Sequence, residues 1–134
     1  MITEKIKKIF FEIKNNVNNQ VKPYDLTAVQ IITLNYLYDN NKKIVIQKNI
    51  CDFLSLKHST VINVLKRLEE KELITKKTNY KSEIAITDKG KALVDNVGAT
   101  PSFVDNKLLK GFNKNEIEEL NDYLDRIYSN INNL

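Results

Sequence analysis

The chain has 134 residues, of which 42% are hydrophobic and 28% are charged, and its formal net charge is +4. This length suits one domain with its own core, and the composition is that of a folded globular protein rather than a disordered one. No apolar run approaches the ~18 residues of a membrane span, and the first residues mix acids with lysines, unlike a signal peptide. We therefore expect a cytoplasmic protein with no membrane segment.

Residues for catalysis or metal binding are scarce. Cys51 is the one cysteine and His58 the one histidine, so we expect neither an internal disulfide nor a zinc site of thiolate and imidazole ligands. No HExxH, CxxC or P-loop pattern occurs, and the three glycines lie far apart. The sequence therefore predicts a protein that is not an enzyme and uses no cofactor.

Two helices are predicted in the first third of the chain. Apolar residues recur every three or four positions from Ile2 to about Gln20, which is typical of one apolar stripe on a helix. We expect the asparagines near Gln20 to fray this helix and Pro23 to end it. In the next helix, Thr27 and Gln30 have the spacing of a capping box. Its apolar residues cover a wide arc, which favours a central position in the fold.

The middle third combines two short helices with a hairpin. A helix is predicted at about 47–54, followed by a turn at 55–57 and a second amphipathic helix with Ser59 as its expected N-cap. Leu73–Lys77 and Glu83–Ile86 have the pattern of two strands joined by a turn. This order of elements is that of a winged helix-turn-helix.

Three further helices are predicted after the hairpin. Thr87 is the expected cap of the first, and the 98–101 segment, Gly-Ala-Thr-Pro, is expected to break or sharply kink it. A helix then restarts at the proline and continues to Leu109. Asn113, with Glu116 three residues later, opens the last helix, whose apolar residues follow a heptad-type pattern.

Positive charge is concentrated in the middle of the sequence. Between Lys42 and Lys91 there are twelve Lys and Arg against six Asp and Glu, a net charge of +6, whereas the remaining residues have a net charge of −2. Such a distribution is expected when one face of a protein meets a polyanion. A solvated lysine-rich surface explains the charge equally well, so charge alone does not decide between the two.

The order of the elements favours DNA binding. In a helix-turn-helix the second helix lies in the major groove, where its side chains meet base edges and phosphates. We expect this helix at about 58–71 and the wing at about 74–87. The candidate DNA-binding residues are Lys57, His58, Ser59, Thr60, Asn63, Lys66, Arg67, Lys76, Lys77, Asn79, Tyr80 and Lys81. Structural alternatives remain open: Ser59 as a helix cap only, His58 as an ordinary surface residue, and Lys66 and Arg67 paired with Glu69 and Glu70.

The chain resembles the MarR family of winged helix-turn-helix transcriptional regulators over nearly its full length. The resemblance is carried by LTAVQIITLNYL, IQKNICDFLSLKHSTVINVLKRLEEKELI, ITDKGKAL and LLKGFNKNEIEELNDYLDRI. The residues that match family patterns are Leu26, Thr27 and Gln30 in the second helix, Ser59, Thr60 and Val61 in the recognition helix, and Ile86, Thr87 and Gly90 after the wing.

The resemblance implies a mainly α fold with a small β-hairpin wing (α+β) and a homodimer that binds a pseudo-palindromic DNA operator, as a repressor. Residues 1–24 and 100–134 are the expected dimerisation helices, and 25–99 the DNA-binding lobe. The expected dimer-interface residues are Ile6, Ile9, Phe10, Ile13, Val17, Ile117, Leu120, Leu124, Ile127 and Ile131. Both apolar stripes could instead fold back within one chain.

The sequence departs from the family pattern at several positions. The wing sequence TNYKSE has no arginine, and Glu72 replaces the usual glycine after the recognition helix. The 98–101 break interrupts what is usually one long helix. Cys51 stands where the family tends to have alanine, which favours a buried, inert thiol over an oxidant sensor.

Two other functions remain open. One is a protein-interaction module of the antirepressor kind, in which the winged helix binds a protein. The other is a ligand or redox sensor with weak DNA binding. A small-molecule effector would then occupy a pocket between the lobe and the dimer helices, lined by Phe10, Tyr36 and Phe103. These aromatic residues are more simply explained as core.

Overall fold

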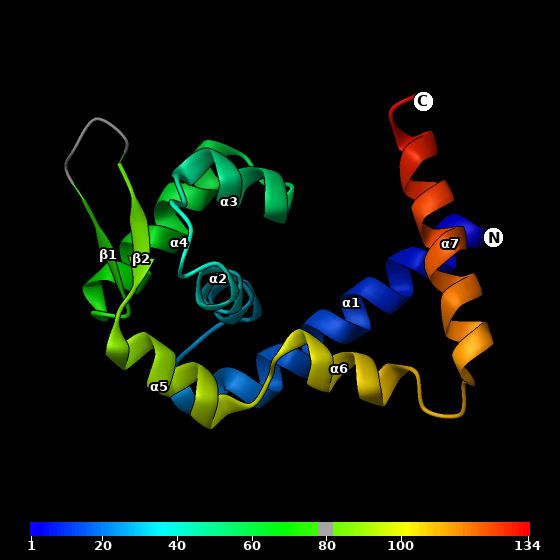
Figure 1. Cartoon of the computed structure of the whole chain (residues 1–134), viewed down its shortest axis with the longest axis horizontal. Coiled ribbons are helices and arrows are strands. Elements are labelled where there is room, and N and C mark those ends of the chain that lie inside the picture. Colours follow the sequence, from blue (N-terminus) through cyan, green and yellow to red (C-terminus); the bar gives the residue numbers. More distant parts are fainter. Residues whose placement is uncertain (78–81) are drawn as a thin grey trace. The chain divides into compact units, whose positions relative to one another are not determined.

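The computed structural model describes residues 1–77 and 82–134 (Figure 1). Its helices are α1 (Ile2–Val21), the short 3-10 helix η1 (Lys22–Tyr24), α2 (Ala28–Asp39), α3 (Gln47–Leu54), α4 (His58–Glu70), α5 (Asp88–Val97), α6 (Pro101–Leu108) and α7 (Lys114–Ile131), and its strands are β1 (Ile74–Lys76) and β2 (Ile84–Ile86). The predicted mainly helical fold with a hairpin is confirmed. The chain forms two compact units, Met1–Pro101 and Ser102–Leu134. None of the described helices is long and apolar enough to cross a membrane.

Helix α2 forms the centre of the first unit, as its wide apolar arc predicted. Ile31, Leu34 and Leu37 are at most 1% exposed. Helices α1, α4 and α5 and strand β2 all contact α2, and Figure 1 shows it nearly end-on among them. On the α5 side, the Tyr38 hydroxyl donates to the Asp95 carboxylate at 3.3 Å, and the charge of Asp95 raises the pKa of Tyr38 above its usual value.

The start of α2 is fixed by hydrogen bonds from two segments. The predicted capping box is present, because Gln30 N donates to Thr27 Oγ1 at 3.3 Å and Thr27 N donates to Gln30 Oε1 at 3.1 Å. In addition, Ala28 N donates to Asn18 Oδ1 at 2.6 Å. The expected fraying of α1 at its asparagines is therefore wrong: the helix continues to Val21, since Asn18 holds the start of α2.

Helix α4 begins one residue earlier than predicted. Ser55 adopts the left-handed conformation (φ 54°) and ends α3, and Leu56 N donates to Cys51 O at 3.2 Å. Lys57 is then the N-cap, and its carbonyl accepts from Val61 N at 3.0 Å. The prediction of Ser59 as N-cap is therefore wrong; Ser59 lies inside the first turn of the helix.

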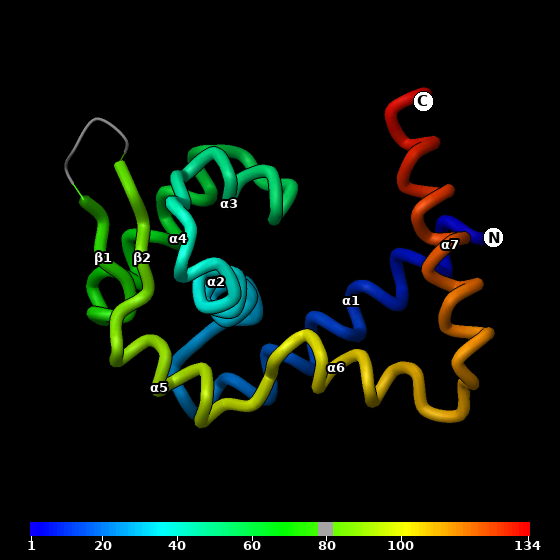
Figure 2. Tube along the Cα trace, viewed as in Figure 1, coloured from blue at the N-terminus to red at the C-terminus, as the bar shows by residue number. Residues whose placement is uncertain are grey.

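The hairpin after α4 is a two-stranded antiparallel sheet. Ile74 pairs with Ile86 and Lys76 with Ile84, and the three isoleucines are buried. Ile84 N also donates to Val45 O at 2.8 Å, so the segment before α3 is joined to the sheet. The trace in Figure 2 shows this wing projecting beside α4, with α5 following β2 directly.

The predicted break at Gly98–Pro101 is confirmed. Gly98 is left-handed (φ 67°) and caps α5, and α6 begins at Pro101. Between them, Ala99 is 4% exposed and its carbonyl accepts from Asn35 Nδ2 at 2.9 Å. The segment that interrupts the helix is thus attached to the middle of α2.

Replacing Gly90 with alanine tests the packing of α5 on the hairpin. A Cβ at this position would lie 2.7 Å from Ile86 Cγ1 and would also clash with the backbone carbonyl of Leu73. We expect Gly90→Ala to lower the free energy of unfolding by about 1–3 kcal/mol, although alanine is otherwise the better helix residue. Urea unfolding followed by circular dichroism measures this change. An unchanged or raised stability would show that α5 does not pack as described.

Replacing Glu72 with glycine tests the turn after α4. Glu72 has φ 61°, a left-handed conformation that a residue with a Cβ adopts at a cost of about 1–2 kcal/mol. We expect Glu72→Gly to raise the free energy of unfolding by roughly 1 kcal/mol, because glycine removes that strain. Thermal and urea unfolding measure it. Glu72→Ala is the control: it removes the same carboxylate but keeps the Cβ, so it should not stabilise the protein.

Candidate nucleic-acid interface

The two faces of α4 differ in exposure. Val61, Leu65 and Leu68 are at most 3% exposed and face the lobe. The predicted DNA-binding residues of this segment are all exposed: Lys57, His58, Ser59, Thr60, Asn63, Lys66 and Arg67. The structure therefore brings these side chains together on one surface. It also adds Ile62, which is 48% exposed and which the sequence pattern did not single out.

His58 is held against α3 at the start of α4. Its Nδ1 lies 3.0 Å from Gln47 Nε2 and 3.5 Å from Cys51 Sγ. An amide nitrogen is only a donor, so Nδ1 accepts and the ring proton of a neutral His58 is on Nε2. Cys51 is buried, as predicted. His58 is thus an exposed residue whose ring orientation is set by a hydrogen bond between the two helices of the helix-turn-helix.

Lys66 and Arg67 remain available for an external anion. The alternative that they pair with Glu69 and Glu70 is not realised, since no ion pair among residues 1–77 and 82–134 involves either cation. Arg67 also borders a pocket of about 460 Å³ between α1, α2 and α4, together with Lys14, Thr60 and Asn63. One flank of the exposed face therefore continues into a basic depression.

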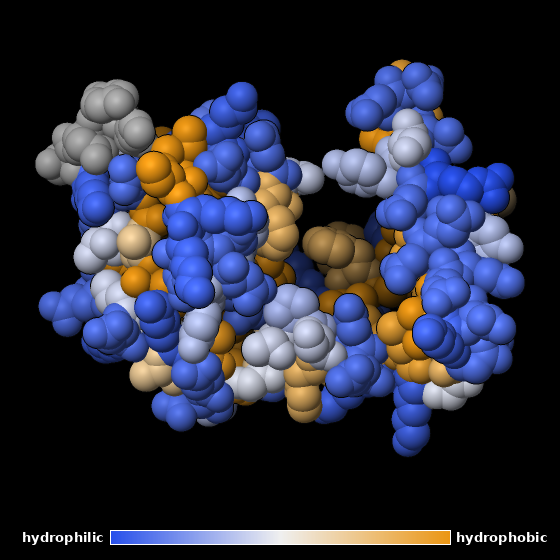
Figure 3. Space-filling model, in the orientation of Figure 1, coloured by the Kyte–Doolittle hydropathy of each residue, from blue (hydrophilic) through white to orange (hydrophobic). Residues whose placement is uncertain are grey.

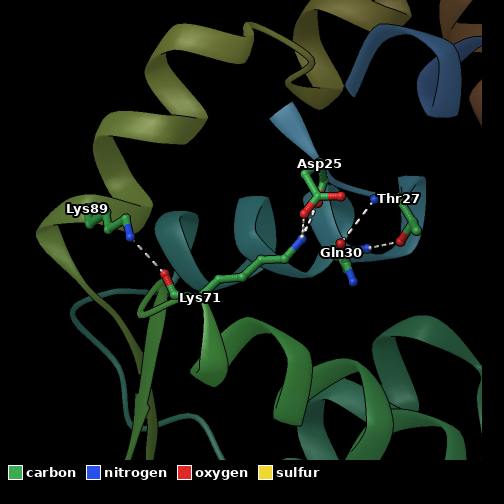
Figure 4. A network of polar contacts seen from close by, with 5 residues as sticks. All are labelled: Asp25, Thr27, Gln30, Lys71 and Lys89. Atoms are coloured by element: carbon green, nitrogen blue, oxygen red, sulfur yellow. Dashed lines mark hydrogen bonds and ion pairs between the residues drawn. The ribbon is translucent and has the colours of Figure 1, made fainter. Parts of the chain in front are cut away.

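The C-terminal end of α4 is fastened by polar contacts (Figure 4). Lys71 Nζ donates to the backbone carbonyl of Asp25 and lies 3.5 Å from its carboxylate. Lys89 Nζ donates to Lys71 O at 3.1 Å and lies 3.8 Å from the Glu72 carboxylate, and Thr87 Oγ1 donates to Glu72 O at 2.7 Å. These contacts come from both the turn before α2 and the start of α5, so they limit how α4 can tilt.

The wing offers fewer described candidates. Lys76 is exposed at the end of β1, and Lys77 is exposed but lies 3.4 Å from the Glu83 carboxylate. The remaining wing candidates, Asn79, Tyr80 and Lys81, lie outside the described residues. The described part of the interface therefore depends mainly on α4.

The apolar stripes expected at a dimer interface are largely uncovered. On α1, Ile6, Ile9 and Phe10 are 43–59% exposed and Ile13 is half-buried, whereas Val17 is only 7% exposed and belongs to the core of its own unit. On α7, Ile117 and Leu120 are half-buried, and the exposed members are Leu124, Ile127 and Ile131. Figure 3 shows uncovered apolar surface where α7 lies.

The three aromatic residues expected to line an effector pocket have separate contacts. The ring of Tyr36 lies 4.4 Å from that of Phe53, and the ring of Phe10 lies 5.6 Å from that of Phe11. Phe103 belongs to the second unit, where Lys107 Nζ lies 4.6 Å from its ring. The pocket therefore stays a prediction.

Comparison with solved structures finds several transcriptional regulators. The MepR–DNA complex of S. aureus is 25% identical, with a TM-score of 0.90 over 98% of this chain and 96% of that one. A putative MarR family regulator from Listeria monocytogenes, complexed with 26mer DNA, is 28% identical, with a TM-score of 0.85 over 98% and 89%. The regulator MarR from Oenococcus oeni PSU-1 is 26% identical, with a TM-score of 0.81 over 96% and 99%. The resemblance to MarR regulators is thereby confirmed.

Comparison with curated proteins finds no match. A family model does match residues 16–97, and its description is transcriptional regulator SarA/Rot. This is a family of regulators rather than of enzymes, as the sequence predicted. Because the match covers more than half of the sequence, the chain belongs to the SarA/Rot family of transcriptional regulators.

Proposed function

We propose that this regulator binds double-stranded DNA in the cytoplasm as a homodimer, with α4 of each chain in the major groove of one half of a pseudo-palindromic operator. The observation that carries the proposal is the outer face of α4, where polar and basic side chains are exposed and Lys66 and Arg67 have no ion-pair partner among the described residues. Repression follows when such a complex occupies a promoter.

The side chains of this face match the chemistry of the major groove. Asn63 can make paired donor and acceptor contacts with adenine, and the hydroxyls of Ser59 and Thr60 suit bases or phosphates. Lys66 and Arg67, one turn further along, suit phosphates, where they add affinity without selecting sequence. Two of the similar solved structures, MepR and the Listeria regulator, are DNA complexes, which supports the same partner for this chain.

The exposed apolar stripes support a dimer. Such stripes on α1 and α7 are unfavourable in water, and a second copy of the chain would cover both. A two-fold axis would also present two copies of α4 to two half-sites, as pseudo-palindromic operators require. Residues 1–24 and 100–134 are accordingly the proposed dimerisation segments, and 25–99 the DNA-binding lobe.

Substitutions in α4 test the contact with DNA. After selection of bound sites from a random DNA pool, we expect Asn63→Ala to weaken binding to the selected site by about 1–3 kcal/mol, because a base contact is lost. Binding to scrambled DNA should change little. Lys66→Ala should weaken both and lower the slope of log K against log salt by about 0.9, the value for one phosphate contact.

Gel shifts over a series of salt concentrations measure both effects. Lys110→Ala is the matched control, since Lys110 is an exposed lysine in the turn between α6 and α7. If Asn63→Ala and Lys66→Ala behaved like this control, α4 would not be the DNA-binding helix. Absence of any salt-dependent binding by the unaltered protein would favour the protein-interaction alternative.

Charged substitutions in the apolar stripes test the dimer. We expect Ile9→Glu and Leu124→Glu each to convert the dimer to monomers, because a carboxylate would be buried without a partner at the interface. Sedimentation velocity measures the change, and specific DNA binding should weaken in parallel. Glu118→Gln, at an exposed polar position of α7, is the control. A monomeric unaltered protein at micromolar concentration would contradict the proposal.

A further inference from the structure

Ile62 is an apolar side chain on the surface that α4 presents to solvent. The other apolar residues of the helix, Val61, Val64, Leu65 and Leu68, are buried or half-buried, whereas Ile62 is 48% exposed. Every residue of α4 is described, so Ile62 is the one exposed apolar residue of this helix. Its side chain is therefore not explained by the core of the lobe.

The position of Ile62 around the helix places it among the candidate base contacts. With 3.6 residues per turn, Ile62 lies about 40° from Lys66 and about 60° from Ser59 around the helix axis. His58, one turn earlier, lies about 40° away on the other side and contacts α3. Ile62 thus occupies the flank of the exposed face nearest α3, while Thr60 and Arg67 occupy the opposite flank beside α1 and α2.

The chemistry of the major groove suggests one partner for an apolar side chain there. Among the groups that base pairs present in this groove, the C5-methyl group of thymine is the apolar one. The β-branched side chain of isoleucine has few χ1 rotamers, so little freedom is lost when it makes such a contact. Lys66 and Ser59 can serve several acceptors on bases or phosphates, and neither distinguishes a methyl group from hydrogen.

We propose that Ile62 contacts the C5-methyl group of a thymine and thereby selects thymine at one position of each half-site. The inference rests on the proposed binding of DNA by α4 and adds a determinant of sequence that the polar residues of the helix do not supply. Asn63, the next residue, suits adenine, so the two side chains together favour A·T pairs at neighbouring positions.

Removal of single methyl groups from the DNA tests this contact. In a site selected by the unaltered protein, each thymine is replaced in turn by deoxyuridine, which keeps the base pairing and removes only the methyl group. At one symmetric position, we expect binding to weaken about three- to fivefold for each methyl group removed. At the other positions deoxyuridine should have little effect.

The protein variants complete the cycle. Ile62→Ala should weaken binding to the thymine site and become indifferent to deoxyuridine at the sensitive position, whereas Ile62→Val, which keeps the branched Cβ, should retain most of the sensitivity. Ile32→Ala, at an apolar residue of α2 that is 37% exposed, is the matched control and should behave like the unaltered protein. Circular dichroism checks that each variant is folded.

Each outcome bears on one hypothesis. If the unaltered protein binds the selected site with a steep salt dependence but is indifferent to deoxyuridine everywhere, the Ile62 contact is overturned and DNA binding stands. The same holds if Ile62→Ala keeps the deoxyuridine sensitivity. If the unaltered protein binds no DNA at all, the proposed function fails and the Ile62 contact fails with it.

Discussion

The burial of α2 is the constraint on which the rest of the lobe depends. Leu34 and Leu37 are at most 1% exposed, and α1, α4, α5 and β2 all pack around this helix. Polar contacts fix its position along the chain: Asn18 and Gln30 hold its start, and Asn35 attaches the segment after α5 to its middle. Once α2 is placed, the inner stripe of α4 has one surface to pack against, so its outer face is determined as well.

Polar contacts then hold α4 at both ends. At the start, the hydrogen bond between Gln47 and His58 joins the two helices of the helix-turn-helix, and at the end Lys71 and Glu72 are tied to the turn before α2 and to α5. Most of these contacts are exposed, and each alone stabilises the fold little. Their arrangement matters more than their strength, because side chains that contact bases are most effective when the helix that carries them is already oriented.

Features that depend on neighbours in the sequence were predictable, and features that depend on distant segments were not. The capping box at the start of α2 and the break at Gly98 follow from local chemistry. The start of α4 does not, because the left-handed conformation of Ser55 ends α3 and moves the cap from Ser59 to the residue two positions earlier. Asn18 was expected to fray α1 because its bond to α2 is invisible in the sequence. The exposure of Ile62 depends on the exact rotation of α4, which apolar periodicity gives only approximately.

The distribution of paired and unpaired cations refines what the net charge of the middle third means. Lys71, Lys77 and Lys89 lie within 4 Å of carboxylates, whereas no described ion pair involves Lys66 or Arg67. The summed charge attracts a polyanion at long range whether or not individual lysines are paired. Direct contact is different, because a paired lysine must first leave its carboxylate. Within the described residues, the wing therefore attracts DNA more than it grips it, and α4 supplies the contacts that select sequence.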